Sequence, residues 1–178
     1  PWFSMRYRDP ELQQNDVANE WLEASLDQMY KAFQRSNFQQ EIHELYYDLV
    51  VFGTAAFYVE AEPNGIRFAC RHIAEICVSE NQDGRVDTVY RHFKMSARAI
   101  AMQLEDDPYK EHDLVHVIYP RSEAGGKASK DKPVASVYYT ADDKQLLSES
   151  GFDEFPFMVT RFVKDSVSTY GRSPAMTA

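Results

Sequence analysis

Two histidines four residues apart, His112 and His116, have a spacing that could support metal chemistry. On a helix this spacing, with an acid after the first histidine, brings both imidazoles to one zinc ion. Residues 114–119 are mostly apolar and β-branched, however, which is typical of a strand. Residues four apart on a strand lie about 13 Å from each other, too far for one ion. Asp113 also stands where that motif has glutamate, so we expect two ordinary histidines.

A second group of possible metal ligands comprises Cys70, His72 and Cys77. A structural zinc site needs four ligands, and only His92, on another predicted strand, could complete this set. The spacing matches no zinc module, and a cysteine at an apolar strand position is usually a small core residue. These residues are therefore weak candidates for a metal site. A metal-dependent hydrolase that uses them, or that uses His112 and His116, is the alternative function if the protein is an enzyme.

The other catalytic signals in the sequence are weak. The stretch Gly125-Gly126-Lys127 lacks the first glycine of a phosphate-binding loop, and Ala128 follows the lysine where a hydroxyl is required. The sequence also has no Gly-x-Ser-x-Gly nucleophile motif. We therefore predict that the protein is not an enzyme and has no catalytic, cofactor-binding or metal-binding residues.

Composition limits the function classes further. The 178 residues carry 19 Lys and Arg against 28 Asp and Glu, a net charge of −9. Tight wrapping of nucleic acid needs clustered cations, so it is excluded, whereas loose passage of DNA is allowed. Two cysteines cannot build a disulfide framework, and no apolar run approaches the roughly 20 residues of a membrane helix. We expect a soluble, intracellular protein with no membrane contact.

Two amphipathic helices are predicted at the start of the chain. Apolar residues recur every three or four positions over residues 16–35 and again over residues 38–52. Asp16 and Asn37 are the expected N-caps, and Gly53 is the expected stop of the second helix. Because only two residues separate the helices, we expect them to pack as a hairpin or an elbow.

After Gly53 the apolar period changes from helical to two, the period of a strand. Asn64-Gly65 and residues 81–84 are predicted to turn the chain between antiparallel strands. A short helix is expected from Ser96 to just before Pro108, and residues 121–133 are expected to form a polar loop. The predicted strands cover residues 54–62, 66–70, 74–80, 85–94, 114–119, 134–140 and 155–163. The fold class is α+β, with an N-terminal helical hairpin followed by a mainly antiparallel β-sheet with one short helix.

Several short phrases, in order along the chain, carry a resemblance to a known family. Together they resemble the portal, or head-to-tail connector, proteins of short-tailed bacteriophages or prophages. No phrase is specific alone, but the ordered set spans nearly the whole chain. The phrases are Ser36-Asn37-Phe38, Leu45-Tyr46-Tyr47-Asp48-Leu49, Phe52-Gly53-Thr54, Glu80-Asn81, the run from Gly84 to Arg91, Gly151-Phe152 with Glu154 and Pro156, and the run from Tyr170 to Met176.

The resemblance implies a structural subunit of a dodecameric ring at one capsid vertex. Such a ring forms the DNA entry and exit channel for packaging and ejection, and its partners are further copies of itself, terminase, capsid and tail proteins, and double-stranded DNA without sequence specificity. The resemblance places the protein in the virion, and in the host cytoplasm during assembly. A cyclic ring needs two different faces per subunit that meet head to tail. A protein-interaction domain of some other chain is a further alternative.

The resemblance also predicts how the chain is organised. Residues 1–53 are expected to form a helical part, 54–170 a β-rich wing-like domain, and 171–178 the start of a truncated channel-helix region. The chain is thus expected to be an excised fragment. The residues between the last two parts are predicted to form a structural joint to the channel helices, with serine as the cap and proline as the first residue of a helix. These residues are Tyr170, Gly171, Arg172, Ser173 and Pro174.

Overall fold

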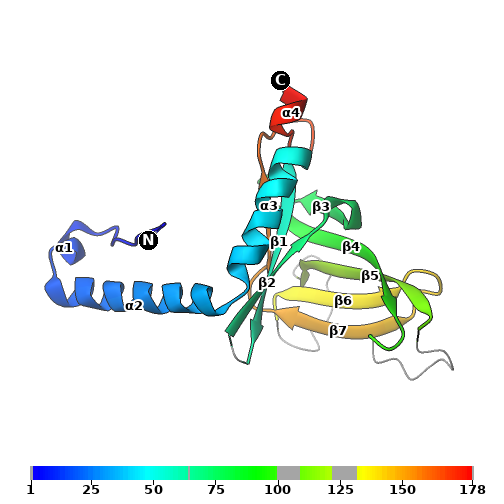
Figure 1. Ribbon diagram of the computed structural model, residues 1–178, viewed down its shortest axis with the longest axis horizontal. Helices are drawn as coiled ribbons and strands as arrows, with labels where there is room; N and C mark the ends of the chain where they lie inside the picture. The colour runs from blue at the N-terminus through cyan, green and yellow to red at the C-terminus, as the bar shows by residue number, and fades with distance from the viewer. Residues whose placement is uncertain (1, 64, 100–108, 122–131, 178) are drawn as a thin grey trace.

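Two antiparallel sheets form the body of the molecule in the computed structural model, which describes residues 2–63, 65–99, 109–121 and 132–177 (Figure 1). The three-stranded sheet has the order β2-β1-β8, and the five-stranded sheet has the order β3-β4-β5-β6-β7. The first comprises β1 (Thr54–Glu62), β2 (Gly65–Arg71) and β8 (Phe157–Arg161). The second comprises β3 (Ile76–Glu80), β4 (Val86–Ser96), β5 (Glu111–Pro120), β6 (Val134–Thr140) and β7 (Leu146–Phe152).

The two sheets share a hydrophobic core. Alternate residues of β1, such as Ala56 and Tyr58, pack with residues of the five-stranded sheet, such as Val89 and Ile118. These side chains are almost completely buried because successive residues of a strand point to opposite faces. The intervening residues of β1 therefore face the other way, toward the helices.

The helix α3 (Phe38–Phe52) covers the other face of the three-stranded sheet. Leu45 packs there with Ala55, Phe57 and Phe68 in a second core cluster. The helix ends at Gly53, whose φ of 75° is left-handed. The predicted C-terminal stop is therefore confirmed.

Asn37 occupies the N-cap position of α3, as predicted, but its side chain makes no capping hydrogen bond. Its side chain instead bonds to both backbone groups of Phe68 on β2: Nδ2 donates to the carbonyl oxygen at 2.8 Å, and Oδ1 accepts from the amide at 2.9 Å. These bonds extend the hydrogen-bonding of β2 to the start of α3. The tertiary partner thus takes the side chain away from the local capping role.

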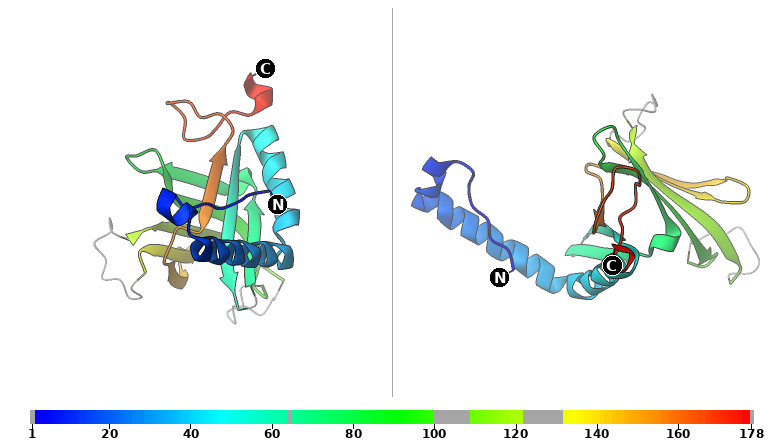
Figure 2. Two further views of the ribbon diagram at one scale, coloured as in Figure 1. Left: turned by 90° about the vertical axis from the view of Figure 1, so that its left-hand side faces the viewer. Right: turned by 90° about the horizontal axis from the view of Figure 1, so that it is seen from above.

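The first part of the chain forms an arm that extends away from the body (Figures 1 and 2). It consists of residues 2–9, α1 (Pro10–Gln13) and α2 (Asp16–Arg35), and residues 2–9 run back alongside α2. Asn15 rather than Asp16 caps α2, because its Oδ1 accepts from the amide of Ala18 at 3.1 Å. The phenol of Tyr30 bonds to the backbone of Phe3 and fixes the returning segment.

The two helices meet as an elbow, which was one of the two expected arrangements, and the helical hairpin of the predicted fold class is wrong (Figure 2). Ser36, between them, has extended backbone and leaves no loop that could reverse the chain. Phe33 at the end of α2 packs on Phe38 and Phe68, with ring centroids 4.8 and 5.8 Å apart. Tertiary packing of these rings sets the direction of the arm.

The predicted α+β class and antiparallel strands are confirmed, with strands in two sheets rather than one. The strand β7 was missed because its sequence, Leu-Leu-Ser-Glu-Ser-Gly-Phe, has few β-branched or aromatic residues; pairing with β6 places it. The helix was expected to begin at Ser96, but Ser96 ends β4 and residues 97–99 form a turn. Residues 100–108 and most of the 121–133 loop lie outside the described residues. Arg121 and Pro133, at the ends of that loop, are joined by a backbone hydrogen bond of 2.8 Å.

Candidate functional site

The C-terminal segment crosses the turn between α3 and β1 at two glycines. A Cβ on Gly53 would lie 2.3 Å from the carbonyl carbon of Arg172, and a Cβ on Gly171 would lie 2.4 Å from the carbonyl oxygen of Gly53. One backbone thus passes directly over the other, and neither glycine has room for a side chain. We call this crossing of Gly53 and Thr54 with residues 170–174 the joint.

Hydrogen bonds hold the two backbones of the joint in register. The amide of Gly171 donates to the hydroxyl oxygen of Thr54 at 2.8 Å, and Thr54 is only 1% exposed. The amide of Phe162 donates to the carbonyl oxygen of Gly53 at 2.9 Å. Val163 and Arg172 form an isolated antiparallel bridge, with N···O distances of 2.7 and 3.3 Å. The C-terminal segment is therefore tied to both sides of the turn.

Tyr170 connects the joint to the five-stranded sheet. Its phenol oxygen accepts from the amide of Val78 at 3.2 Å and lies 3.5 Å from the carbonyl oxygen of Ile76, to which it donates. Both partners belong to β3, an edge strand of that sheet. The side chain therefore uses backbone groups that an edge strand leaves unpaired.

A group of charges spans the same region. Glu80 at the end of β3 makes an ion pair with Arg161 at the end of β8 and another with Lys164 at 2.6 Å. Arg161 also donates to the carbonyl oxygen of Thr169 at 3.2 Å. The side chains of Glu80 and Arg161 are 17% and 15% exposed, so this pair is less screened by solvent than a surface pair. It links the ends of the two sheets beside the joint.

The side chain of Arg172 lies on the surface of the joint. It pairs with Asp165 at 3.1 Å and is 61% exposed. The carboxylate of Asp165 accepts from the amides of Ser168 and Val167, and these bonds, with a smaller effect of Arg172, hold the pKa of Asp165 below its usual range. The turn is therefore ordered by its own aspartate, and an exposed ion pair adds little to stability.

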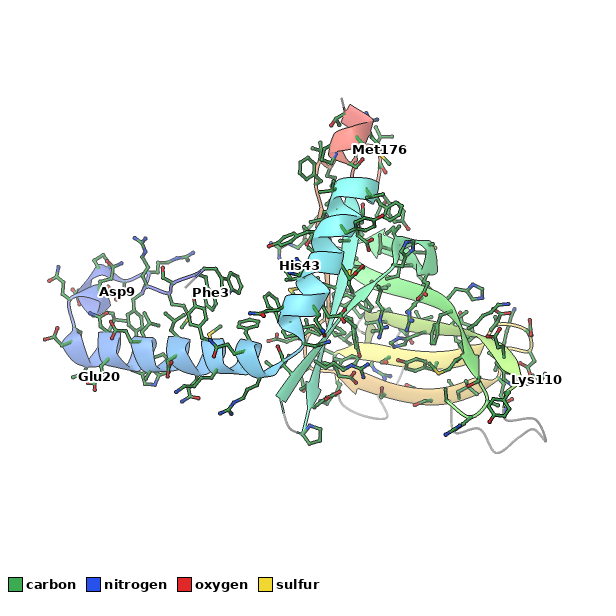
Figure 3. The ribbon with its side chains drawn as sticks, in the orientation of Figure 1. Phe3, Asp9, Glu20, His43, Lys110 and Met176 are labelled. Atoms are coloured by element: carbon green, nitrogen blue, oxygen red, sulfur yellow. The ribbon has the colours of Figure 1, made fainter. Side chains whose placement is uncertain are left out.

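Ser173 and Pro174 begin the short helix α4 (Pro174–Thr177), as predicted. The Ser173 hydroxyl accepts from the amide of Met176 at 3.3 Å, and its carbonyl oxygen accepts from the Thr177 hydroxyl at 3.2 Å. Ser173 is fully buried, whereas α4 itself points away from the body (Figure 3). The direction of α4 is therefore fixed at Ser173, the residue that precedes it.

The five predicted joint residues are consecutive in the chain. The structure gives them partners that the sequence did not indicate. Gly53 was identified only as a helix stop, although the close approach requires glycine as well. Thr54 and Glu80 lay within the phrases that carried the resemblance, without an assigned contact. Nothing in the sequence singled out Arg161 or Asp165, because their partners are fixed only by the fold.

The candidate metal ligands do not come together. His112 and His116 lie on β5, as the strand prediction required. Cys70 lies on β2 beneath α3, and Cys77 lies exposed on β3 of the other sheet. Within residues 2–63, 65–99, 109–121 and 132–177, no group of three or more His, Cys, Asp or Glu could hold a metal ion. The hydrolase alternative gains no support.

Cys70 is poorly suited to act as a metal ligand or nucleophile. Its thiol donates to Asp48 at 3.7 Å, and burial together with nearby carboxylates raises the pKa of the thiol to about 12. Reaction and metal binding need the thiolate. Burial also raises the pKa of Asp48, which is only 4% exposed. This pair belongs to the packing between α3 and β2.

His116 and Ser136 form a serine–histidine pair on neighbouring strands, with Nε2 2.8 Å from Oγ. His116 is 4% exposed and Ser136 is 2% exposed, so a substrate cannot reach the hydroxyl. Burial, aided by Arg91 and Arg71, lowers the pKa of His116 to about 3, so the imidazole is neutral. The ring stacks on Tyr138 at 3.8 Å. The pair is part of the packed interior between the sheets.

The Gly125-Gly126-Lys127 stretch lies outside the described residues. Among the helices of the described ranges, none combines the length and the apolar character that a membrane crossing requires.

Comparison with known proteins identifies related chains over the full length. Residues 1–178 match the model of a family described as bacteriophage head to tail connecting protein. The chain is 31% identical over 198 residues to the portal protein of Salmonella phage epsilon15 and 27% identical over 197 residues to the probable portal protein of Bordetella phage BPP-1. Each match covers 100% of this chain and 36% of the relative. The chain therefore spans about a third of the length of these relatives.

Proposed function

The chain belongs to the bacteriophage head to tail connecting protein family, and we propose that it is a structural part of a phage portal. In this proposal the whole protein assembles into a ring at one capsid vertex, and the ring forms the channel through which DNA enters and leaves. The observation that carries the proposal is the match to the family model over residues 1–178.

The structure supports a mechanical role for residues 170–174. They are held by backbone hydrogen bonds, a buried serine and two glycines in contact, and they lead into a helix that points away from the body. We propose that the joint fixes the direction of the segment that follows relative to the two sheets. In a ring, this direction must be the same in every subunit. The proposed division is residues 1–53 as the helical part, 54–170 as the wing-like part and 171–178 as the start of the next region.

The proposed partners are further copies of the protein, terminase, capsid and tail proteins, and double-stranded DNA. DNA passes through the channel without sequence-specific contacts, and the net charge of −9 suits a surface that does not hold phosphates. The proposed location is the virion, and the host cytoplasm during assembly. The proposed role is non-catalytic and needs no cofactor.

Negative-stain electron microscopy of the full-length protein, purified without other virion components, tests this proposal. Rings with a central channel are the expected result. Particles of uniform size with no ring, across a range of protein and salt concentrations, would contradict it. Elemental analysis of the same sample tests the hydrolase alternative, since stoichiometric zinc would favour that alternative.

A further inference from the structure

The helix α2 has an exposed apolar stripe with no partner in the chain. None of its 20 residues is buried, although residues 2–9 cover one side. The opposite side carries Val17 and Trp21, 76% and 64% exposed, followed by Ala24. These three residues share a face because they are three or four positions apart. A surface tryptophan on such a stripe is typical of a protein interface.

The charges of α2 divide into two halves. Asp16, Glu20, Glu23 and Asp27 lie in the first part, and the basic residues Lys31 and Arg35 lie in the last turns. Among the described residues, only Asp27 of the four acids has an ion-pair partner, Lys31 at 2.6 Å. Glu20 lies on the side of α2 away from the segment that carries Phe3 and Asp9 (Figure 3). The exposed stripe is therefore bordered by unneutralised carboxylates.

A cleft at the other end of the helix has complementary properties. It lies between the end of α2 and β2 and has a volume of about 540 Å³. Its lining includes the apolar side chains of Ala32 and Ile66, and Ile66 is 38% exposed. Three cations and one carboxylate also line it: Lys31, Arg35, Arg67 and Glu62. Lys31 is paired with Asp27 and Arg67 lies 3.7 Å from Glu62, which leaves Arg35 without an ion pair among the described residues.

We propose that Trp21 and the acidic half of α2 in one copy dock into this cleft of the next copy. The inference rests on the proposed ring and names the contact by which the arm joins neighbouring subunits. The apolar stripe meets Ile66, and Glu20, which borders the stripe, approaches Arg35. Two different surfaces of one chain meet in this contact, so it repeats head to tail, as a cyclic ring requires.

The cleft of the same chain cannot be the partner of Trp21. The residue lies 14 positions before the end of α2, which corresponds to about 21 Å along a helix that rises 1.5 Å per residue. The arm is also directed away from the body (Figures 1 and 2). Only a second copy can therefore bring the two surfaces together.

Site-directed crosslinking of the full-length protein tests the contact. Cysteines are introduced as Trp21→Cys with Ile66→Cys in a Cys77→Ser background, because the native Cys77 is exposed. A short bis-maleimide is applied to assembled protein, and products are separated by denaturing electrophoresis. The double variant is expected to give a ladder of covalent oligomers, and each single variant only monomer. Glu23→Cys with Ile66→Cys is the matched control, because Glu23 lies on a different face of α2 from Trp21.

The outcomes separate the docking contact from the ring itself. Rings without a ladder would overturn the contact and leave the proposed function standing, whereas wild-type protein without rings would overturn both. Dimers from Trp21→Cys alone would show a two-fold α2–α2 contact and overturn the inference, as would an equal ladder from the Glu23→Cys control.

If the double-cysteine variant forms no rings, the contact is tested instead by exchanging the charges of Glu20 and Arg35. Glu20→Lys and Arg35→Glu should each raise the protein concentration needed for rings, roughly tenfold, and their combination should restore it. No restoration would overturn the contact.

Discussion

Substituting Gly53 by alanine should separate the two backbones that cross at the joint. The new Cβ would lie 2.3 Å from both the carbonyl carbon of Arg172 and the nitrogen of Ser173. These atoms belong to backbone, so no side-chain rotation relieves the contact. The φ of 75° adds the cost of a left-handed conformation for alanine.

Gly84→Ala is the matched control for Gly53→Ala. Gly84 has nearly the same φ, 72°, but a Cβ there would meet only the Lys164 Nζ at 3.5 Å, an ordinary contact. The left-handed conformation costs alanine about 1–2 kcal/mol at either position. Overpacking at Gly53 adds about 1–3 kcal/mol. The difference between the variants therefore isolates the close approach of the backbones.

Thermal unfolding followed by circular dichroism measures this difference. For a chain of this size, 1 kcal/mol corresponds to roughly 2–4 °C in Tm, so Gly53→Ala should unfold about 2–12 °C below Gly84→Ala. Gly171→Ala should act on the same contact, because its Cβ would lie 2.4 Å from the carbonyl oxygen of Gly53. The double variant of Gly53 and Gly171 should then lose less stability than the sum of the singles. Equal Tm values for Gly53→Ala and Gly84→Ala would refute the reasoning.

Three further changes test other contacts. Thr54→Val removes the buried acceptor for the Gly171 amide and should cost about 1–3 kcal/mol of unfolding free energy in urea, whereas Thr54→Ser should cost less because it keeps the hydroxyl. His116 has a pKa of about 3 when folded against 6.5 unfolded, so the unfolded chain binds the extra proton between these values and stability falls as pH decreases from 6.5 toward 3. When the pH falls from 7 to 4.5, the free energy of unfolding of His116→Gln should therefore decrease by about 2–3 kcal/mol less than that of the wild type. An equal decrease would contradict a buried neutral imidazole. Asn37→Ala removes both bonds to the Phe68 backbone and should lower the free energy of unfolding by about 2–3 kcal/mol. In urea this appears as a lower midpoint with an unchanged m-value. A loss below about 0.5 kcal/mol would show that these bonds do not hold α3 on β2.

The sequence by itself determined the features that depend on neighbouring residues. The period of apolar residues located α2 and α3, and the change to a period of two located most strands. Gly53 ended α3, and Ser173 with Pro174 started α4, because caps act within one helical turn. The ordered phrases also pointed to the correct family before any contact was known.

The features that depend on distant residues could not be predicted in this way. Asn37 holds the N-cap position of α3, but its side chain bonds to Phe68, 31 positions away. The packing of Phe33 on Phe68 selects the elbow from the two arrangements that the short connection allowed. The division of the strands into two sheets follows from core contacts on both faces of β1. The joint depends on residues still farther apart, since the Thr54 hydroxyl and the Gly171 amide are 117 positions apart. A local pattern fixes only the conformation of a segment, whereas packing and the pairing of buried polar groups fix which segments meet.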